Sequence, residues 1–253
     1  MISIVIRVKN EIDTLPLLIE SLKNQTYKNY EIIVVDNEST DGTFEYASAH
    51  ADTVVTITSK EFSHAKSTNL GIQQAKGKYV YITNGRSMPT SIFMLETAKR
   101  ILDKNYKVAG IFGNVKVHKD KKRRNYTELW FDNLTYLLLS RKYKEIQRFY
   151  PGLLQTISCM IRTDLAKEYP YEEMASKGGE DILFGLKMIN KGYKVAFHPD
   201  LNVYHSHGGK NLNTINRYLS YSKMAREAII KSSGKTPIPT RIIKTTKKII
   251  TSL

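Results

Sequence analysis

The chain has 253 residues, 41% of them apolar, which is enough to bury the core of one substantial globular domain with or without a small appendage. Its single cysteine, Cys159, excludes an intramolecular disulfide and favours a reducing compartment. No apolar run reaches the roughly 18 residues of a transmembrane helix, and the first residues read as a strand, so we expect neither a membrane span nor a signal peptide.

Positive charge is concentrated in two segments of the chain. The net charge is +15, and residues 116–148 and 209–253 contribute +6 and +9 of it, while the remainder is balanced. Such segments are typical of a protein that binds nucleic acid and equally of one that docks on an anionic bilayer. The charge alone favours neither partner.

The first 115 residues alternate between apolar strand patterns and short helical patterns. This alternation predicts an α/β fold with a mainly parallel central sheet. Ligands of such sheets bind beyond the carboxyl ends of the strands, where Asp36 and the loop 84–89 are expected. Strands are predicted at 2–8, 31–35, 54–58 and 77–83, and helices at 15–21, 43–50 and 67–75.

The character of the chain changes near residue 116, where a basic cluster begins. We therefore divide the chain into a domain over 1–208, with halves 1–115 and 116–208, and a helical, basic appendage over 209–253. The later elements are predicted as a helix at 126–139, a strand at 156–162, a helix at 180–191, strands at 194–197 and 202–205, and a helix at 213–230.

Asp36 is the first candidate for a chemical role, because it ends the strand in the segment VVDNESTDGT. A carboxylate at that position can accept hydrogen bonds from a nucleobase or a ribose. The other interpretation is an N-cap of the next helix, a role that Thr40 or Asp41 could also fill.

Four segments, in order along the chain, resemble the family-2 glycosyltransferases of the GT-A fold. They are SIVIRVKNE, NQTYKNYEIIVVDNESTDGT, FSHAKSTNLGIQQAKGKYVYIT and GGEDILFGLKMINKGYKVAFHPDLNVYHSH. The resemblance implies a mainly parallel central sheet flanked by helices. It also implies that residues 1–115 bind a nucleotide-sugar donor and that residues 116–208 carry catalysis and the acceptor.

The resemblance extends to single residues near the donor. Asp36 matches the family's contact to the base, while Asn10 and Glu11 match an Asn-Glu pair that follows the first strand. Asn69 matches an Asn of the helix that lines the donor pocket, and a plain helix residue is the alternative. The full set expected at the donor is Arg7, Asn10, Glu11, Asp36, Asn69, Asn84, Arg86 and His205.

The sequence departs from the family where the fourth strand ends. Most of these enzymes have an Asp-X-Asp-like motif there that holds a divalent metal on the donor diphosphate, whereas no carboxylate lies between Glu61 and Glu96. Arg86 stands in its place, and a guanidinium can neutralise a diphosphate directly. We expect no metal cofactor, with Mn²⁺ or Mg²⁺ as the alternative; Arg86 could instead be an ordinary loop residue or mark an inactive relative.

Glu180 and Asp181 form the second chemical centre, at the predicted start of a helix after two glycines. Sugar transfer needs a base for the proton of the attacking hydroxyl, and the resemblance assigns this role to Asp181. A carboxylate base implies direct displacement and inversion at the anomeric carbon. The alternative is a pair of acids that the helix dipole favours in a first turn.

The acceptor is expected near Leu154, Gln155 and Thr156, by the same resemblance. The aromatic residues of 126–139 could stack on sugars or pack a core. Apolar side chains of residues 242–253 fall on one face of a helical wheel, opposite Lys and Arg. This pattern is typical of an in-plane membrane helix, and packing on the core or on a second subunit of a homodimer is the alternative.

The sequence therefore predicts an inverting glycosyltransferase at the cytoplasmic face of the plasma membrane. It would move a sugar from a UDP-, GDP- or dTDP-linked donor to a lipid-linked acceptor in the synthesis of a bacterial capsule or lipopolysaccharide. An inactive GT-A-like protein and a nucleic-acid or anion binder are the alternatives. No recognised nucleic-acid motif is present, so nucleic acid is not an expected partner.

Overall fold

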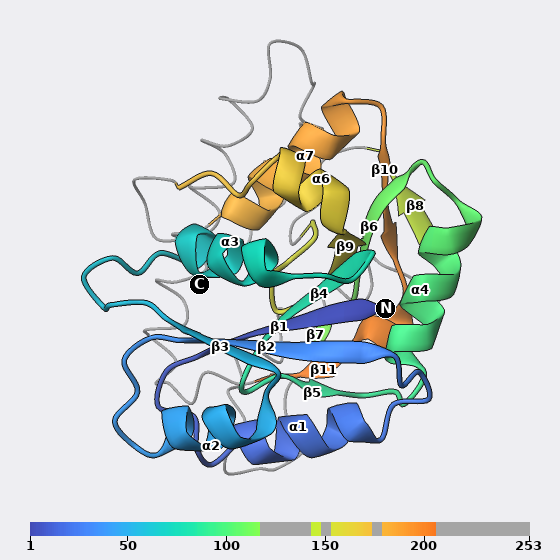
Figure 1. Cartoon of the computed structure of the whole chain (residues 1–253). Helices are drawn as coiled ribbons and strands as arrows, with labels where there is room; N and C mark the ends of the chain where they lie inside the picture. Colours follow the sequence, from blue (N-terminus) through green and yellow to red (C-terminus); the bar gives the residue numbers. More distant parts are fainter. Residues whose placement is uncertain (117–142, 148–152, 174–178, 206–253) are drawn as a thin grey trace, which may run out of the picture.

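A computed structural model gives the arrangement of the chain (Figure 1). The residues that it describes are 1–116, 143–147, 153–173 and 179–205. The helices predicted at 126–139 and 213–230 and the amphipathic tail 242–253 lie outside the described residues.

The core of the fold is an eight-stranded sheet with the order β3-β2-β1-β4-β9-β6-β10-β8. The pairs β3–β2, β2–β1, β1–β4 and β6–β10 are parallel, while β9 runs antiparallel between β4 and β6, and β8 antiparallel beside β10. The predicted mainly parallel α/β sheet is confirmed. Its strands are β1 (Ile2–Val8), β2 (Tyr30–Asp36), β3 (Thr53–Thr56), β4 (Tyr79–Asn84), β6 (Val108–Phe112), β8 (Lys144–Ile146), β9 (Ser158–Arg162) and β10 (Lys194–Phe197).

Helices cover both faces of this sheet (Figure 1). One apolar core joins the sheet to α1, α2 and α4, and a second joins the other face to α3, α6 and α7. None of the described helices is both long and apolar enough to span a bilayer. The helices are α1 (Leu15–Lys23), α2 (Thr43–His50), α3 (His64–Gln74), α4 (Met94–Lys104), α6 (Thr163–Glu168) and α7 (Glu180–Asn190), with a 3-10 turn η2 at Pro199–Leu201.

The central strand β1 shows why the sheet is buried on both faces. All seven of its residues are buried, and Ile4 and Ile6 belong to the core under α1 while Val5 belongs to the core under α3. A strand covered by helices on both sides reads as a continuous apolar run. The exceptions are Ser3, whose hydroxyl donates to the carboxylate of Glu31 at 2.6 Å, and Arg7.

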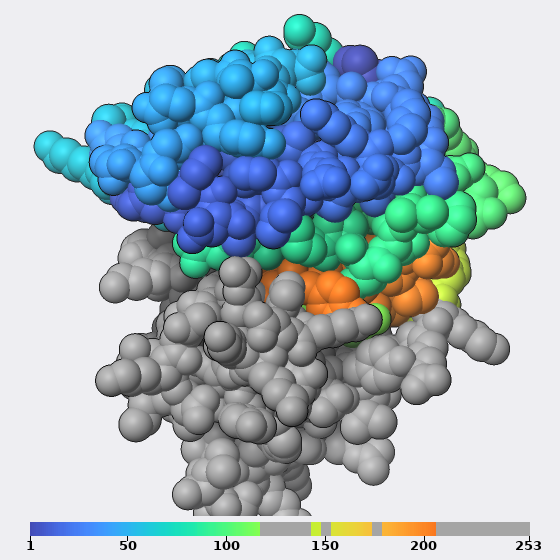
Figure 2. All heavy atoms as spheres, turned by 90° about the horizontal axis from the view of Figure 1, so that it is seen from below, coloured from blue at the N-terminus to red at the C-terminus, as the bar shows by residue number. Residues whose placement is uncertain are grey.

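A second sheet of three short strands brings the end of the described chain next to the end of β4. Its order is β5-β11-β7, with β11 antiparallel to β5 and parallel to β7. Viewed from the side of α1 and α2, these two helices lie beside the green and orange segments that carry β5 and β11 (Figure 2). The strands are β5 (Met88–Pro89), β7 (Val115–Lys116) and β11 (Val203–Tyr204).

Gly113, between β6 and β7, makes this second sheet sensitive to a single methyl group. A Cβ there would lie 2.0 Å from the backbone carbon and oxygen of Leu201, neither of which can move without shifting η2. We expect Gly113→Ala to lower the free energy of unfolding by about 2 kcal/mol, the scale of overpacking. Urea denaturation measures the change, with the exposed Lys107→Ala as the control; equal midpoints for both variants would contradict the expected clash.

Candidate active site

The candidate site lies at the carboxyl edge of the parallel strands, as the sequence predicts. The register pairs Val8 with Asp36 and Arg7 with Asn84, so β1, β2 and β4 end at one level. The segment before β9 reaches the same edge because β9 runs in the opposite direction. Loops from both halves of the chain therefore surround one region.

The loops that follow β1 and β2 are fastened to each other by side chain to backbone hydrogen bonds. Asn10 accepts from the amide of Thr40 at 2.8 Å, and its own amide donates to Ser39 Oγ at 2.9 Å. The amide of Glu11 donates to Thr43 Oγ1 at 2.8 Å. Asn10 was expected at the donor, but its side-chain oxygen holds the loop that follows Asp36.

Asp36 is almost fully buried, with 1% of its surface exposed. Its Oδ2 accepts from the amide of Ser39 at 3.0 Å, and its buried Oδ1 has no hydrogen-bond partner among the described residues. The first amide of α2, that of Thr43, instead donates to Asp41 at 3.0 Å, so Asp36 is not the cap of that helix. An unpaired buried oxygen costs about 1–3 kcal/mol, which a ligand donor could recover.

Arg86 lies at the end of β4 in an ion pair with Glu11. Its Nε donates to Glu11 Oε1 at 2.6 Å, while its Nη1 and Nη2 make no hydrogen bond with any described residue. The side chain of Arg86 is 40% exposed, and that of Glu11 only 8%. Burial raises the pKa of Glu11, and the guanidinium of Arg86 opposes this rise. A Cβ at position 85 would lie 2.2 Å from Glu11 Oε2, so a larger residue there would displace the end of the Glu11 side chain.

The described residues do not fit a divalent metal ion at this place. Nowhere in the described part of the chain do three His, Cys, Asp or Glu side chains come together as ligands. At the end of β4 a cation would meet the positive charge of Arg86. Among the described residues, the end of β4 thus offers Asn84, Arg86 and the Arg86-paired Glu11 rather than a cluster of metal ligands.

Asn84 and His205 support the loop that carries Arg86. Asn84 Oδ1 accepts from Ser87 Oγ at 2.8 Å and from the amide of Arg86 at 3.2 Å. His205 is 4% exposed, and its Nδ1 lies 3.3 Å from Ser87 Oγ. Both residues, expected as donor contacts, therefore fix the shape of the β4 loop.

Glu180 and Asp181 are brought to the same edge by the first turn of α7, which starts after Gly179 in the left-handed conformation (φ 93°). Glu180 is buried, and Asp181 is partly exposed. Asp181 Oδ1 accepts from the amide of Ile182 at 2.7 Å. Burial, and then the charge of Glu180, raise the pKa of Asp181 to about 7, while that amide and Arg7 act against the rise. Asp181 therefore exchanges a proton near neutral pH, as a general base must.

The three residues expected at the acceptor hold the segment before β9. Thr156 receives both hydrogen bonds of Arg7 Nη2, at 2.9 Å through its carbonyl and 3.0 Å through its hydroxyl. Leu154 is fully buried with φ 51°, and its side chain packs in the core. Gln155 donates to the carbonyl of Gly113. Arg7, expected at the donor, is thus directed toward this segment.

His64 is a residue that the sequence did not single out. It opens α3, and the pKa of its imidazole is lowered by burial and by Arg7, with Glu180 acting in the opposite direction. Its position in the run FSHAK, directly before the helix that carries Asn69, was the available signal. Asn69 itself uses both ends of its amide on the backbone of Tyr171, at 2.8 and 2.9 Å.

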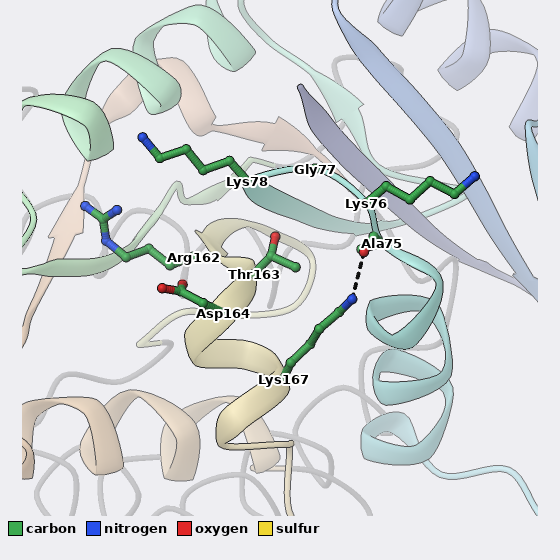
Figure 3. Close-up of a pocket in the computed structure, with 8 residues that line it drawn as sticks. All are labelled: Ala75, Lys76, Gly77, Lys78, Arg162, Thr163, Asp164 and Lys167. Atoms are coloured by element: carbon green, nitrogen blue, oxygen red, sulfur yellow. Dashed lines mark hydrogen bonds between the residues drawn. The ribbon is translucent and has the colours of Figure 1, made fainter.

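A pocket of about 330 Å³ lies at the opposite edge of the sheet, where β4 begins and β9 ends (Figure 3). Three of its four cations are already engaged: Arg162 donates to three backbone carbonyls, Lys78 pairs with Asp103 at 2.8 Å, and Lys167 donates to a backbone carbonyl. Lys76 and Lys78 point away from each other. This pocket is therefore not a convergent site.

Comparison with known proteins gives one family match. The sequence profile of glycosyl transferase family 2 matches residues 3–168. The O-antigen chain rhamnosyltransferase WbaN of Salmonella anatum is 24% identical over 78% of this chain and 63% of its own length. The UDP-Glc:alpha-D-GlcNAc-diphosphoundecaprenol beta-1,3-glucosyltransferase WfaP of Escherichia coli is 27% identical over 45% of this chain and 51% of its own. The chain thus spans less than two thirds of either relative.

Solved structures agree in fold. S. aureus TarS in complex with UDP-GlcNAc aligns with a TM-score of 0.63 at 16% identity, over 92% of this chain and 68% of its own. Glucosyl-3-phosphoglycerate synthase from Mycobacterium tuberculosis, in a complex with Mn²⁺, UDP and its product, aligns with a TM-score of 0.63 at 15% identity, over 94% and 81%. At this identity the likeness extends to the architecture alone.

The raised pKa of Asp181 has a consequence for stability. Between its ordinary value of 3.8 and about 7, the folded protein keeps a proton that the unfolded chain has lost. Asp181 therefore lowers the free energy of unfolding progressively as the pH rises through this window. We expect Asp181→Asn to gain stability over the wild type from pH 4 to 7, measured by urea denaturation, whereas the exposed Asp13→Asn follows the wild type. A difference that does not change with pH would contradict the raised pKa.

Proposed function

This chain belongs to glycosyl transferase family 2, and from that premise we propose that it transfers a sugar from a nucleoside-diphosphate donor to a hydroxyl of a lipid-linked glycan, with inversion of the anomeric carbon. Asp181 is the general base, and Arg86 takes the charge of the donor diphosphate. The acceptor is a growing bacterial surface glycan, met at the cytoplasmic face of the membrane.

The feature that carries this proposal is Asp181 in the first turn of α7, beside Glu180 and near enough to Arg7 at the end of β1 for that charge to act on its carboxyl group, whose pKa is raised. A carboxylate accepts the proton of the acceptor hydroxyl most efficiently when its pKa lies near the working pH. As the hydroxyl oxygen attacks the anomeric carbon, the bond to the diphosphate breaks, and the proton passes to Asp181. One displacement without a covalent intermediate inverts that carbon.

The donor is proposed to lie along the loops after β1, β2 and β4. The unpaired Oδ1 of Asp36 can accept an N–H or O–H of the base or ribose. Nucleotides with uracil, guanine or thymine are the proposed classes, and the similar S. aureus protein has been solved with UDP-GlcNAc. A lipid-linked acceptor is suggested by the relative whose name specifies GlcNAc-diphosphoundecaprenol.

Arg86 is proposed to contact the diphosphate with the end of its guanidinium. Glu11 holds Nε, which leaves Nη1 and Nη2 as a pair of parallel donors. Two such donors match the spacing of phosphate oxygens. As the sugar leaves, negative charge grows on the diphosphate, and a fixed cation there stabilises the transition state.

The base assignment predicts a loss of turnover without a loss of binding. Asp181→Asn should lower transfer and donor hydrolysis by roughly 100-fold or more, the scale of a lost general base. Calorimetric titration with UDP, GDP and dTDP should give the wild-type affinity for whichever nucleotide binds. Glu145→Gln, which removes an ion pair with Lys194 at the far edge of the sheet, is the matched control. Near-normal turnover by folded Asp181→Asn would remove Asp181 from the mechanism.

The assignment of Arg86 predicts activity without a divalent cation. Donor hydrolysis should continue in EDTA, because the positive charge is part of the chain. Arg86→Ala should lose roughly 100-fold in rate, the scale for one lost electrostatic donor, and added Mn²⁺ should not restore it. Strict dependence of the wild type on Mn²⁺ or Mg²⁺ would overturn the assignment.

A further inference from the structure

Arg7 is a charged residue in the least polar position of the fold. It follows the apolar run Ile4-Val5-Ile6 near the end of the central strand β1 and is 9% exposed. Burying a guanidinium is expensive unless a carboxylate pairs with it. No carboxylate among the described residues lies within ion-pair distance of Arg7, so its place in the strand is not explained by a salt bridge.

The hydrogen bonds of Arg7 instead join the two halves of the chain. Nη2 binds both the carbonyl and the hydroxyl of Thr156, a residue 149 positions away, and Nη1 lies 3.5 Å from the carbonyl of His64. The segment that it grips contains the left-handed Leu154 and leads directly into β9. Without these hydrogen bonds, the segment around the left-handed Leu154 would be held less firmly.

The positive charge of Arg7 also acts electrostatically on several titratable groups around it. It acts on Glu11 from the β1 loop, His64 from α3, Cys159 from β9, Tyr171 before α7, and Asp181 from α7. The other charge that acts on Asp181 is Glu180, from the same helix. Since Arg7 forms no ion pair with Asp181, it favours the carboxylate without occupying the oxygen that must take a proton.

We propose that Arg7 is a positioning residue that couples the two halves of the site: it holds the segment 153–157 against the end of β1 and keeps Asp181 ready to accept a proton. This inference rests on the proposed function, in which Asp181 is the base. It assigns Arg7 to the base and to the acceptor side, where the family resemblance had implied the donor.

Three variants separate the effect of the Arg7 charge from the effect of its hydrogen bonds to Thr156. Arg7→Gln removes both, Arg7→Lys keeps the charge but loses the two-pronged contact, and Thr156→Val keeps Arg7 and removes only its hydroxyl partner. Thr156→Val conserves volume and keeps the backbone carbonyl, so a variant that folds is available even if Arg7→Gln does not.

The charge is tested through the pH dependence of unfolding, which needs no ligand. The stability difference between Arg7→Gln and Arg7→Gln/Asp181→Asn should begin at the same pH as in the Arg7 background but keep growing to a pH about one unit higher, since removing the opposite charge raises the pKa of Asp181 in the folded state only. In the pH profile of the donor hydrolysis rate, the low-pH limb should also move to higher pH. Arg7→Lys and Thr156→Val should leave this limb within a few tenths of a unit of the wild type.

The hydrogen bonds between Arg7 and Thr156 are tested by amide hydrogen exchange at residues 153–157. Amides of this segment should exchange about tenfold faster in Arg7→Lys and Thr156→Val, while the affinity for UDP, GDP or dTDP stays within threefold of the wild type. Unchanged exchange and an unchanged limb would overturn the inference, and a loss confined to nucleotide affinity would return Arg7 to the donor. Wild-type protein that hydrolyses no UDP-, GDP- or dTDP-sugar would instead overturn the proposed function.

Discussion

The concentration of negative charge at one edge of a buried sheet is the constraint on which the rest of this structure depends. Glu11, Asp36 and Glu180 are each less than a tenth exposed, and Asp181 follows Glu180 in the first turn of α7. Carboxylates in such surroundings need positive charge and hydrogen-bond donors. The chain supplies them locally. Arg86 pairs with Glu11, the amide of Ser39 donates to Asp36, and the amide of Ile182 in the first turn of α7 donates to Asp181.

The first half of the fold was predictable because its information is local. Strand β1 and the ends of β2 at Asp36 and β4 at Asn84 follow from apolar runs that stop at polar residues, and parallel strands align those ends. The acids of α7 were recognisable because they follow glycines at a helix start. Their approach to Arg7 at the end of β1 could not be read from the sequence, since no local pattern specifies it.

The rest of the site depends on contacts between distant segments, which the hydrophobic periodicity of the sequence does not reveal. The antiparallel course of β9 between two parallel strands delivers Thr156 to Arg7, and nothing in the strand pattern 156–162 gives its direction. Arg7 therefore appeared to be a donor residue, and His64 appeared to be an ordinary start of a helix. Asn10, Asn84 and His205 lie in the loops at this edge and Asn69 lies within α3, but the hydrogen-bond partners of all four emerged only in three dimensions.

The course of β9 also bears on how the chain acquires its shape during synthesis. In the order of synthesis β1 to β4 precede residues 158–162, so the side of β4 that does not pair with β1 lacks its partner strand until those residues are made. An exposed apolar edge strand is a template for pairing with other chains. Any pairing of β1 to β4 before residues 158–162 are made would leave one edge of β4 unprotected, and the arrival of β9 would cover that edge and bring Thr156 to Arg7.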